Sequence, residues 1–182
     1  MLRGSCGYGL LLAGALPVLL DAAASATCGF VPPECPDVSF DFAALQAQTR
    51  TRDLQIGGAA YNEHFWLRFC QTPAEPCLSS GVHEAAIVHT WTDVGEQGGP
   101  HCAALGELHT AEWELLDASS ERHGMRVRYS GGDGGRSSEV HFICDRSAGT
   151  PTVLSAVEGP THHWTLVVSA KEVSCLSTSC SN

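Results

Sequence analysis

Positive charge is scarce in this chain of 182 residues, and lysine occurs only once, at Lys171. Ten Lys and Arg residues stand against twenty Asp and Glu residues, which gives a net charge of −10 at pH 7 with histidine neutral. Binding to nucleic acids or to anionic membranes requires clustered Lys and Arg. The composition therefore argues against both kinds of partner, and the acidic character mainly implies solubility.

Long apolar runs are also scarce, and the one that stands out is Gly9 to Leu20. It is shorter than the roughly 20 residues that a membrane-spanning helix needs. Arg3 precedes it and the small residues Ala24-Ser25-Ala26 follow, which is the pattern of a secretory signal peptide. We expect residues 1–26 to be removed and residues 27–182 to form one domain. An uncleaved anchor is the weaker alternative, because Asp21 interrupts the apolar run.

The nine cysteines include Cys6 in the signal segment, which leaves an even set of eight. An even number in a secreted chain indicates a disulfide framework. Zinc is the rival interpretation, but no Cys-x-x-Cys knuckle occurs and the spacings are wide. We therefore expect no metal or other cofactor. The eight cysteines are Cys28, Cys35, Cys70, Cys77, Cys102, Cys144, Cys175 and Cys180.

Short runs with alternating polarity predict an all-β domain. Met125, Val127 and Tyr129 alternate with Arg126 and Arg128, which is the period of a half-buried strand. Many short strands between turns rich in Gly, Pro, Ser and Asp are typical of a sandwich or barrel. The helical candidate at 42–48 is too short to be stable alone. The expected strands are 64–70, 84–91, 111–116, 125–130, 137–144, 151–157 and 163–169.

The most specific segment is YSGGDGGRSSEVHFIC, from Tyr129 to Cys144. It predicts a strand, a glycine turn around Asp133 and a second strand that ends on a cysteine, because glycine adopts positive φ at little cost. The layout resembles the C-terminal half of a mannose 6-phosphate receptor homology (MRH) domain. In that family a tyrosine, a Gly-Gly-Asp turn, an arginine, a glutamate and two strand-ending cysteines follow one another, and Arg136 and Glu158 fall at the arginine and glutamate positions.

The resemblance extends more weakly over most of the chain, from about Cys28 to Cys175. It implies a flattened β-barrel or sandwich of two crossed antiparallel sheets, stabilised by disulfides, with a sugar site at one mouth. The segments that carry the first half of the resemblance are SFDFAAL (39–45), HFWLRFC (64–70), EAAIVHTW (84–91) and AALGEL (103–108).

The resemblance also implies a set of sugar-binding residues. In the family an arginine fork donates to vicinal mannose hydroxyls and a carboxylate accepts from two of them. Arg136 and Glu158 match these two positions. The family's glutamine position falls on His89, and its tyrosine position falls on Thr165, or on Trp164 if the turn is one residue longer. With two of the four residues present, we expect weak affinity for mannose.

Phosphate recognition is not expected. Family members that recognise the phosphate have a longer loop after the Gly-Asp turn, and here the loop is only Gly134-Gly135. The family also carries a bridged cysteine pair at this turn and at the start of the last strand, and both cysteines are absent here. The pairings that the resemblance implies for the others are Cys144–Cys175, Cys70 with Cys28 or Cys35, Cys77–Cys102, and Cys180 with the remaining N-terminal cysteine.

Two other kinds of site are disfavoured. SGGDGG is similar to the GDSGG motif of trypsin-like proteases, but Gly134 stands in place of the serine nucleophile, so no acyl-enzyme chemistry follows. Adjacent histidines such as His162 and His163 point to opposite faces of a strand and do not easily share a metal ion. The four tryptophans are mostly expected in the core, and Trp91 is the exception because it shares a strand face with His89.

The sequence therefore supports a lectin-like, non-enzymatic domain that binds mannose-bearing N-glycans in the lumen of the secretory or endo-lysosomal pathway, or after secretion. The alternative is a domain that kept the fold, lost sugar binding and serves as a protein-interaction module or accessory subunit. Because the chain stops seven residues after Cys175, we expect either a soluble member of the family or a truncated membrane receptor.

Overall fold

The structure is a computed structural model, and it describes residues 29–33, 36, 40–42, 45–46, 54–57, 63–74, 77, 79–92, 100–116 and 124–171. Most of the regular structure in the described part is strand, with three short 3-10 helices and a helical turn at Leu45–Gln46. The strands are β1 (Gly29–Phe30), β2 (Phe40–Asp41), β3 (Leu54–Gly57), β4 (His64–Leu67), β5 (Ile87–Trp91), β6 (His101–Ala104), β7 (Glu112–Leu115), β8 (Met125–Tyr129), β9 (Ser137–Cys144), β10 (Thr152–Glu158) and β11 (His163–Ala170).

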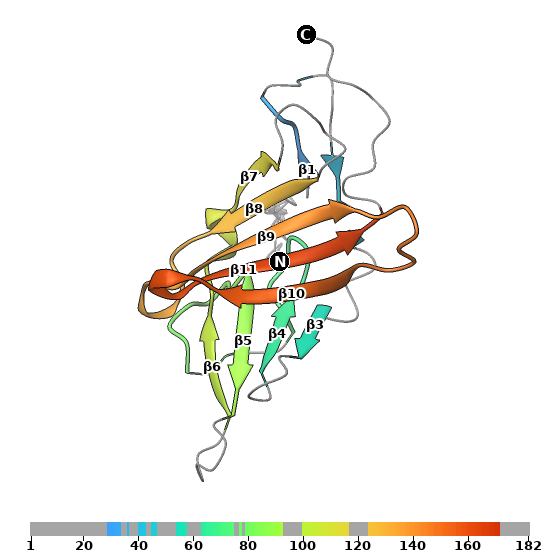
Figure 1. The fold of residues 1–182 in the computed structure, drawn as a ribbon. Coiled ribbons are helices and arrows are strands. Elements are labelled where there is room, and N and C mark those ends of the chain that lie inside the picture. Colours follow the sequence, from blue (N-terminus) through green and yellow to red (C-terminus); the bar gives the residue numbers. More distant parts are fainter. Residues whose placement is uncertain are drawn as a thin grey trace, which may run out of the picture.

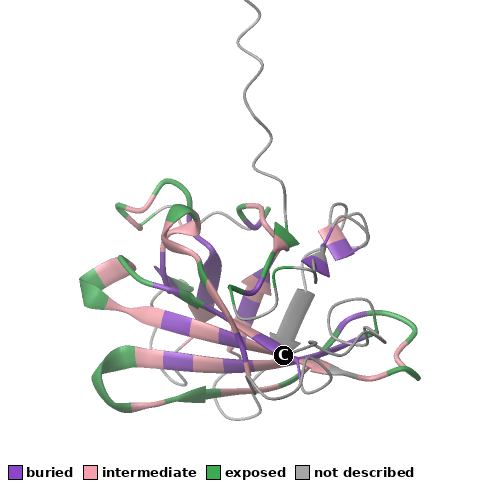
Figure 2. Cartoon of the chain, turned by 90° about the horizontal axis from the view of Figure 1, so that it is seen from above, coloured by how far each residue is buried: buried purple, intermediate pink, exposed green. Residues whose placement is uncertain are grey.

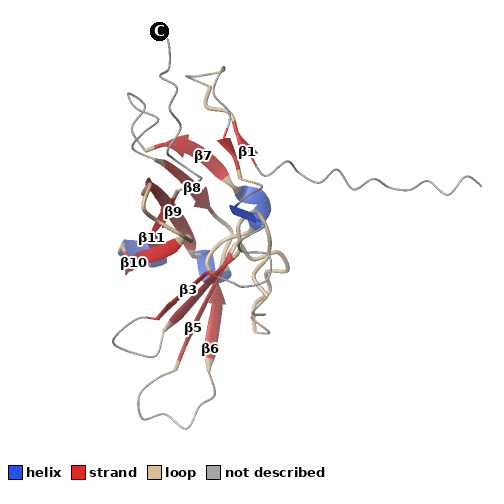
Figure 3. Ribbon diagram, turned by 90° about the vertical axis from the view of Figure 1, so that its right-hand side faces the viewer, coloured by secondary structure: helices blue, strands red, loops and turns tan. Residues whose placement is uncertain are grey.

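The strands form two main sheets that cross (Figures 1 and 3). The five-stranded sheet has the order β10-β11-β9-β8-β7 and the four-stranded sheet has the order β3-β4-β5-β6, while β1 and β2 make a small separate ribbon. Figure 1 shows the long strands of the first sheet running across the strands of the second. This is the arrangement of a crossed β-sandwich, and the prediction of an all-β domain of two crossed sheets is confirmed.

All seven expected strands are present, with ends shifted by up to a few residues. Four short strands were not expected, namely β1, β2, β3 and β6. In the helical candidate at 42–48, Leu45 and Gln46 are helical and the Gln46 N–H donates to the Phe42 carbonyl at 2.7 Å. No helix in the described ranges combines the length and the apolar character needed to cross a membrane.

One feature of the five-stranded sheet differs from the prediction of antiparallel sheets. β11 pairs in parallel with β9 over all eight residues, from His163 beside Ser137 to Ala170 beside Cys144. The cause is the path of the chain. After β9 the chain passes to the edge of the sheet as β10, and the β10–β11 hairpin then places β11 between β10 and β9. An antiparallel hairpin inserted in this way makes its inner strand parallel to the preceding one.

The core lies between the two sheets, and alternation along the strands supplies it. In β8 Met125, Val127 and Tyr129 are buried while Arg126 and Arg128 face outward. Figure 2 shows the same alternation along the other long strands, with the exposed residues gathered at the hairpin ends. Burial of these apolar side chains is the main stabilising term for such a domain. The largest fully buried side chains are Phe42, Phe65, Phe142, Leu45, Ile87, Leu105, Met125, Leu166, Val88, Val127, Val140 and Val168.

The outer face of the four-stranded sheet carries a second, smaller cluster. Ala85, Val88 and Ala104 are buried there, and Cys77 and Cys102 pack against them. Cys77 and Cys102 form a disulfide, so this expected pairing is confirmed. Cys70 is also disulfide-bonded, and its partner lies outside the described side chains. The Cys144–Cys175 pairing and the pairings of Cys28, Cys35 and Cys180 lie outside them as well.

The glycine turn between β8 and β9 is bonded tightly to the four-stranded sheet. The Asp133 carboxylate accepts a hydrogen bond from the Ala104 N–H at 2.7 Å, and the Gly132 N–H donates to the Arg136 carbonyl at 2.9 Å. Gly134 has φ of 61°, which favours glycine. A Cβ on Gly132 would lie 2.6 Å from the Ala104 carbonyl oxygen and 2.8 Å from the Arg136 carbonyl oxygen. The turn therefore approaches backbone on both sides without space for a side chain.

We predict that Gly132→Ala destabilises the protein, because backbone atoms in two segments would have to move. Overpacking of this kind costs about 1–3 kcal/mol in the free energy of unfolding. Urea unfolding of the oxidised protein measures it. Gly149→Ala is the matched control, since a Cβ there meets nothing within 4 Å. Equal unfolding midpoints for the two variants would contradict the proposed packing of the turn.

Candidate functional site

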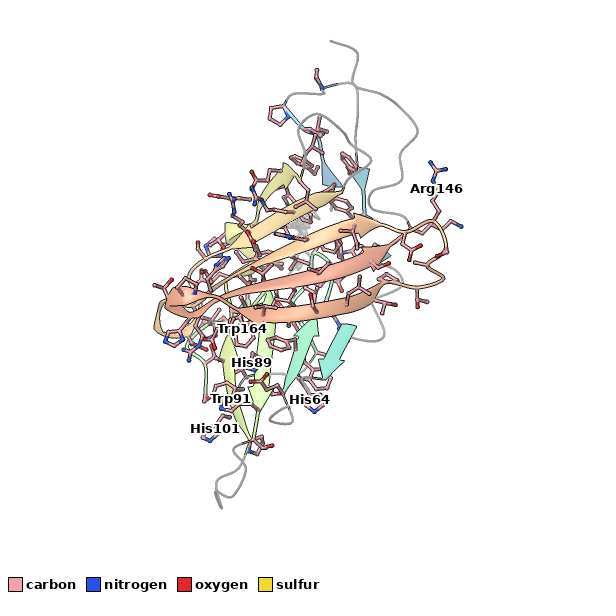
Figure 4. All side chains as sticks on the ribbon, viewed as in Figure 1. His64, His89, Trp91, His101, Arg146 and Trp164 are labelled. Atoms are coloured by element: carbon pink, nitrogen blue, oxygen red, sulfur yellow. A yellow bond between two sulfur atoms is a disulfide. The ribbon has the colours of Figure 1, made fainter. Side chains whose placement is uncertain are left out.

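A cavity of about 280 Å³ lies where the two sheets cross, and side chains from both sheets line it. β5 supplies His89 and Trp91, and β11 supplies Trp164. Figure 4 shows these three side chains close together, and it shows Arg146 at the opposite end of the five-stranded sheet. The described residues that line the cavity are Glu63, His89, Trp91, Arg136, Glu158, His162 and Trp164.

Stacked rings form the apolar wall of this cavity. The His89 imidazole lies between Phe65 and Trp91, with ring centroids at 4.4 Å and 4.8 Å. Trp164 comes from the other sheet and lies 4.8 Å from both Phe65 and His89. Trp91 stacks in turn on His101 at 5.5 Å. Contacts between aromatic rings at these distances are favourable beyond the area that they bury, so the rings hold the two sheets together beside the cavity.

His89 is the most buried polar group of the site. Its side chain is 7% exposed, and its Nε2 atom has no hydrogen-bond partner among the described residues. The nearest carboxylate oxygen, Oε1 of Glu63, lies 3.8 Å away, which is too long for a hydrogen bond. Burial lowers the pKa of His89 to about 4, with Glu158 acting in the opposite direction and Arg136 adding to the decrease. The imidazole is therefore neutral at pH 7.

The glycine turn positions Arg136 at the cavity. Arg136 follows the turn directly, and its Nη1 donates to the Asp133 carbonyl at 2.8 Å. Its backbone N–H donates to the same carbonyl at 3.2 Å. Because Asp133 is bonded to Ala104 of β6, the guanidinium is held in position relative to both sheets.

The β10–β11 hairpin positions Glu158 and His162 at the rim. Glu158 ends β10, and its Oε1 lies 3.0 Å from Nδ1 of His162. The turn is closed by a hydrogen bond from the Gly159 N–H to the His163 carbonyl at 2.7 Å. Thr161 and His162 have φ of 63° and 56°, a conformation that residues other than glycine seldom adopt. Strain of this kind is often found at functional sites.

The structure brings together four of the five residues that the sequence proposed for sugar binding. Arg136, Glu158, His89 and Trp164 all line the cavity. Thr165 does not, because neighbouring residues of a strand point to opposite faces. Its hydroxyl lies on the outer face of the sheet, 3.3 Å from a carboxylate oxygen of Glu139. Of the two alternatives for the tyrosine position, the structure therefore places Trp164 at the cavity.

Two lining residues, Glu63 and His162, were not proposed as sugar ligands from the sequence. The strand pattern alone gives no signal for Glu63, because its place depends on the register between β4 and β5. Glu63 lies two residues before Phe65, which pairs with His89, so Glu63 belongs to the same sheet face as the predicted site. The sequence gives no signal for the place of His162 beside Glu158, because that place depends on the unusual turn.

The remaining aromatic and histidine candidates lie elsewhere. The Trp66 indole N–H donates to the Thr90 hydroxyl at 3.1 Å on the outer face, and Trp113 packs against the main core. His163 faces the outside of the five-stranded sheet, where its Nδ1 lies 2.8 Å from the Ser137 hydroxyl. Within the described ranges, no group of three or more His, Cys, Asp or Glu side chains could hold a metal ion.

The similarity of this chain to known proteins is visible in the fold. No protein-family model and no curated protein matches the sequence. Domain 11 of chicken IGF2R superposes with a TM-score of 0.54 and 19% identity, covering 85% of this chain and 95% of that domain. Domain 11 of the echidna mannose 6-phosphate/IGF2R receptor superposes with a TM-score of 0.52 and 16% identity, covering 84% and 97%. The MRH domain of Yos9, solved in complex with α3,α6-Man5, has a TM-score of 0.46 and 14% identity, covering 70% and 79%.

At these identities the similarity concerns the arrangement of the strands. The match covers nearly the whole of each receptor domain, so the fold is shared as a unit. The crossing of the two sheets agrees with the architecture that the sequence predicted. This chain therefore has the fold of a mannose 6-phosphate receptor homology domain.

Proposed function

We propose that this protein is a lectin-like domain of the secretory pathway that binds mannose-containing N-glycans in the cavity between the sheets, without catalysis and without phosphate recognition. One observation carries the proposal. Arg136, Glu158, His89 and Trp164 were each aligned with a sugar-binding position from the sequence, and they come from four separate segments of the chain. All four line one cavity.

The chemistry of the lining suits a polyhydroxylated ring. The guanidinium of Arg136 offers several N–H donors in one plane, and the carboxylate of Glu158 can accept from two adjacent hydroxyls. The indoles of Trp91 and Trp164 offer apolar faces for the C–H side of the ring. The volume of about 280 Å³ lies near the lower end for ligand pockets, which suits a single sugar residue.

The same lining favours low affinity. His89 stands at the position of the family's glutamine and reaches less far than an amide, while Trp164 lacks the phenol of the family's tyrosine. Each sugar hydroxyl that is buried without a partner costs about 1–3 kcal/mol of binding free energy. We therefore expect dissociation constants for single sugars that are much higher than those of members with the complete set of four residues.

The disulfides support the proposed compartment. Cys77 and Cys102 are bridged and Cys70 is disulfide-bonded. Bridges of this kind form and persist in oxidising compartments such as the lumen of the secretory pathway or outside the cell. This agrees with the signal segment expected at residues 1–26.

The alternative function is a protein-interaction module or accessory subunit that has the fold but no longer binds sugar. The replacement of two of the four sugar-binding residues favours this alternative. A well-folded protein that binds no glycan would support this alternative function.

We predict that Arg136→Ala reduces binding to high-mannose glycans by about tenfold or more, since charge-assisted hydrogen bonds contribute roughly 1.5–3 kcal/mol. A glycan array probed with the secreted, oxidised protein at pH 7.4 and pH 5.5 measures the binding. Circular dichroism establishes that the variant is folded.

Arg146→Ala is the matched control for Arg136→Ala. Arg146 is exposed in the turn after β9 and lies far from the cavity (Figure 4). Loss of binding in Arg136→Ala alone supports the proposed site. Equal binding by both variants would exclude Arg136 as a sugar ligand, and absence of binding by the unmodified protein would exclude the lectin function.

A second prediction concerns stability and pH, because His89 is buried in its neutral form. The ordinary pKa of a histidine is 6.5 and the pKa of His89 in the folded protein is about 4, so between these pH values the unfolded chain binds the additional proton. Stability that is present above pH 6.5 is therefore lost as the pH falls towards 4. For this one group the loss between pH 7 and pH 5 is about 2 kcal/mol.

Chemical unfolding at pH 7 and pH 5 tests this prediction by comparison with His89→Gln, which cannot titrate. We expect the variant to lose about 2 kcal/mol less than the unmodified protein over this interval. His83→Gln, which replaces an exposed histidine, should keep the original dependence. If His89→Gln and the unmodified protein lose stability equally, His89 is not buried as a neutral group.

A further inference from the structure

Glu63 has no assigned role in the proposed site, although it lies beside the most buried polar group of the cavity. It directly precedes β4, and the β4–β5 register pairs Phe65 with His89. Side chains two residues apart on a strand share a face. Glu63 and Trp91 are therefore neighbours of the Phe65–His89 pair on the cavity side, and both line the cavity.

The Glu63 carboxylate and the His89 imidazole lie close enough to contact the same ligand atom. Oε1 of Glu63 and Nε2 of His89 are 3.8 Å apart and do not bond directly. The nitrogen is buried without a hydrogen-bond partner among the described residues. An unpaired buried nitrogen is unfavourable, so a ligand atom that pairs with it gains stability. An oxygen atom beside the pair can lie about 2.8 Å from both atoms, within normal hydrogen-bond length, once a small movement of the imidazole uncovers its enclosed nitrogen.

We propose that Glu63 and His89 together recognise one free hydroxyl of the bound sugar, and that Glu63 makes the site selective for uncharged rings. In the tautomer that carries its proton on Nε2, the neutral imidazole donates to the hydroxyl, and the hydroxyl donates its own proton to the Glu63 carboxylate. An ether oxygen can only accept, and a position without oxygen can do neither. This inference rests on the proposed function and adds a specificity-determining residue to it.

The charges of the cavity lining also favour an uncharged ring over a phosphorylated one. The described lining contains two carboxylates, from Glu63 and Glu158, and one guanidinium, from Arg136. Glu158 is partly exposed and contacts His162 at the rim, whereas the Glu63 side chain is 25% exposed and lies against the buried imidazole. A phosphate ester carries a charge of about −1.5 to −2 at pH 7. Glu63 would therefore repel a sugar phosphate, although the other hydroxyls of its ring remain free to form hydrogen bonds.

NMR titration can test this inference on the full, oxidised chain with methyl α-mannoside, its 6-phosphate and its monodeoxy analogues. The unmodified protein should bind the uncharged ring in preference to the phosphate. Glu63→Gln should reduce that preference by about tenfold. One monodeoxy analogue should bind the unmodified protein more weakly than the parent sugar. Glu63→Asp, which withdraws the acceptor, should remove most of this difference, which is the signature of coupled groups.

Two variants distinguish the effect of the Glu63 charge from the effect of its hydrogen bond to the sugar hydroxyl. Glu63→Asp keeps the charge but withdraws the carboxylate, so it should still exclude the phosphate while losing the coupling to the hydroxyl. Glu84→Gln replaces an exposed glutamate outside the described lining and should behave like the unmodified protein. Thermal unfolding establishes that each variant is folded.

The outcomes separate this inference from the function on which it rests. If the unmodified protein binds methyl α-mannoside, but Glu63→Gln keeps the preference for the uncharged ring and Glu63→Asp keeps the loss with each deoxy analogue, the role of Glu63 is wrong and the lectin function stands. If the unmodified protein binds none of these sugars, the proposed function fails.

Discussion

The contact of Trp164 with Phe65 and His89 joins the two sheets at the point where the cavity lies. Trp164 belongs to the inner strand β11 of one sheet, and the other two rings belong to the paired strands β4 and β5 of the second. Crossed sheets diverge away from the point of closest contact, so the ring contacts both close the core on one side and leave an open space beside it. The aromatic wall, the buried imidazole and the rim carboxylates are all arranged around this contact.

The glycine turn supplies the second constraint, because it determines where the cationic group of the site lies. Asp133 bonds the turn to Ala104 of β6, and Gly132 permits an approach that no side chain would allow. Arg136 is then held by the carbonyl of the same aspartate. Hydrogen bonds to backbone thus fix the local geometry of this turn.

Local patterns in the sequence were sufficient for most of the fold and for part of the site. The strong alternation of β8 and β9 predicted both strands, whereas β3 (LQIG) and β6 (HCAA) carry too short a pattern to be recognised. The parallel pairing of β11 with β9 arises from non-local topology and leaves no local signal. Counting residues along the sequence could not decide whether Trp164 or Thr165 lies at the cavity, because a shift of one residue exchanges the two faces of a strand. Glu63 was missed for a related reason, since its place depends on the register between β4 and β5.

The most direct test of a sugar site at the sheet crossing uses the four indole N–H signals of the protein in an NMR titration with methyl α-mannoside. Trp91 and Trp164 line the cavity, whereas Trp66 lies on the outer face of its sheet and Trp113 packs against the main core. We predict shifts for the signals of Trp91 and Trp164 and constant positions for the other two, which serve as internal controls. Constant positions for all four signals, or shifts confined to Trp66 and Trp113, would contradict a sugar site in this cavity.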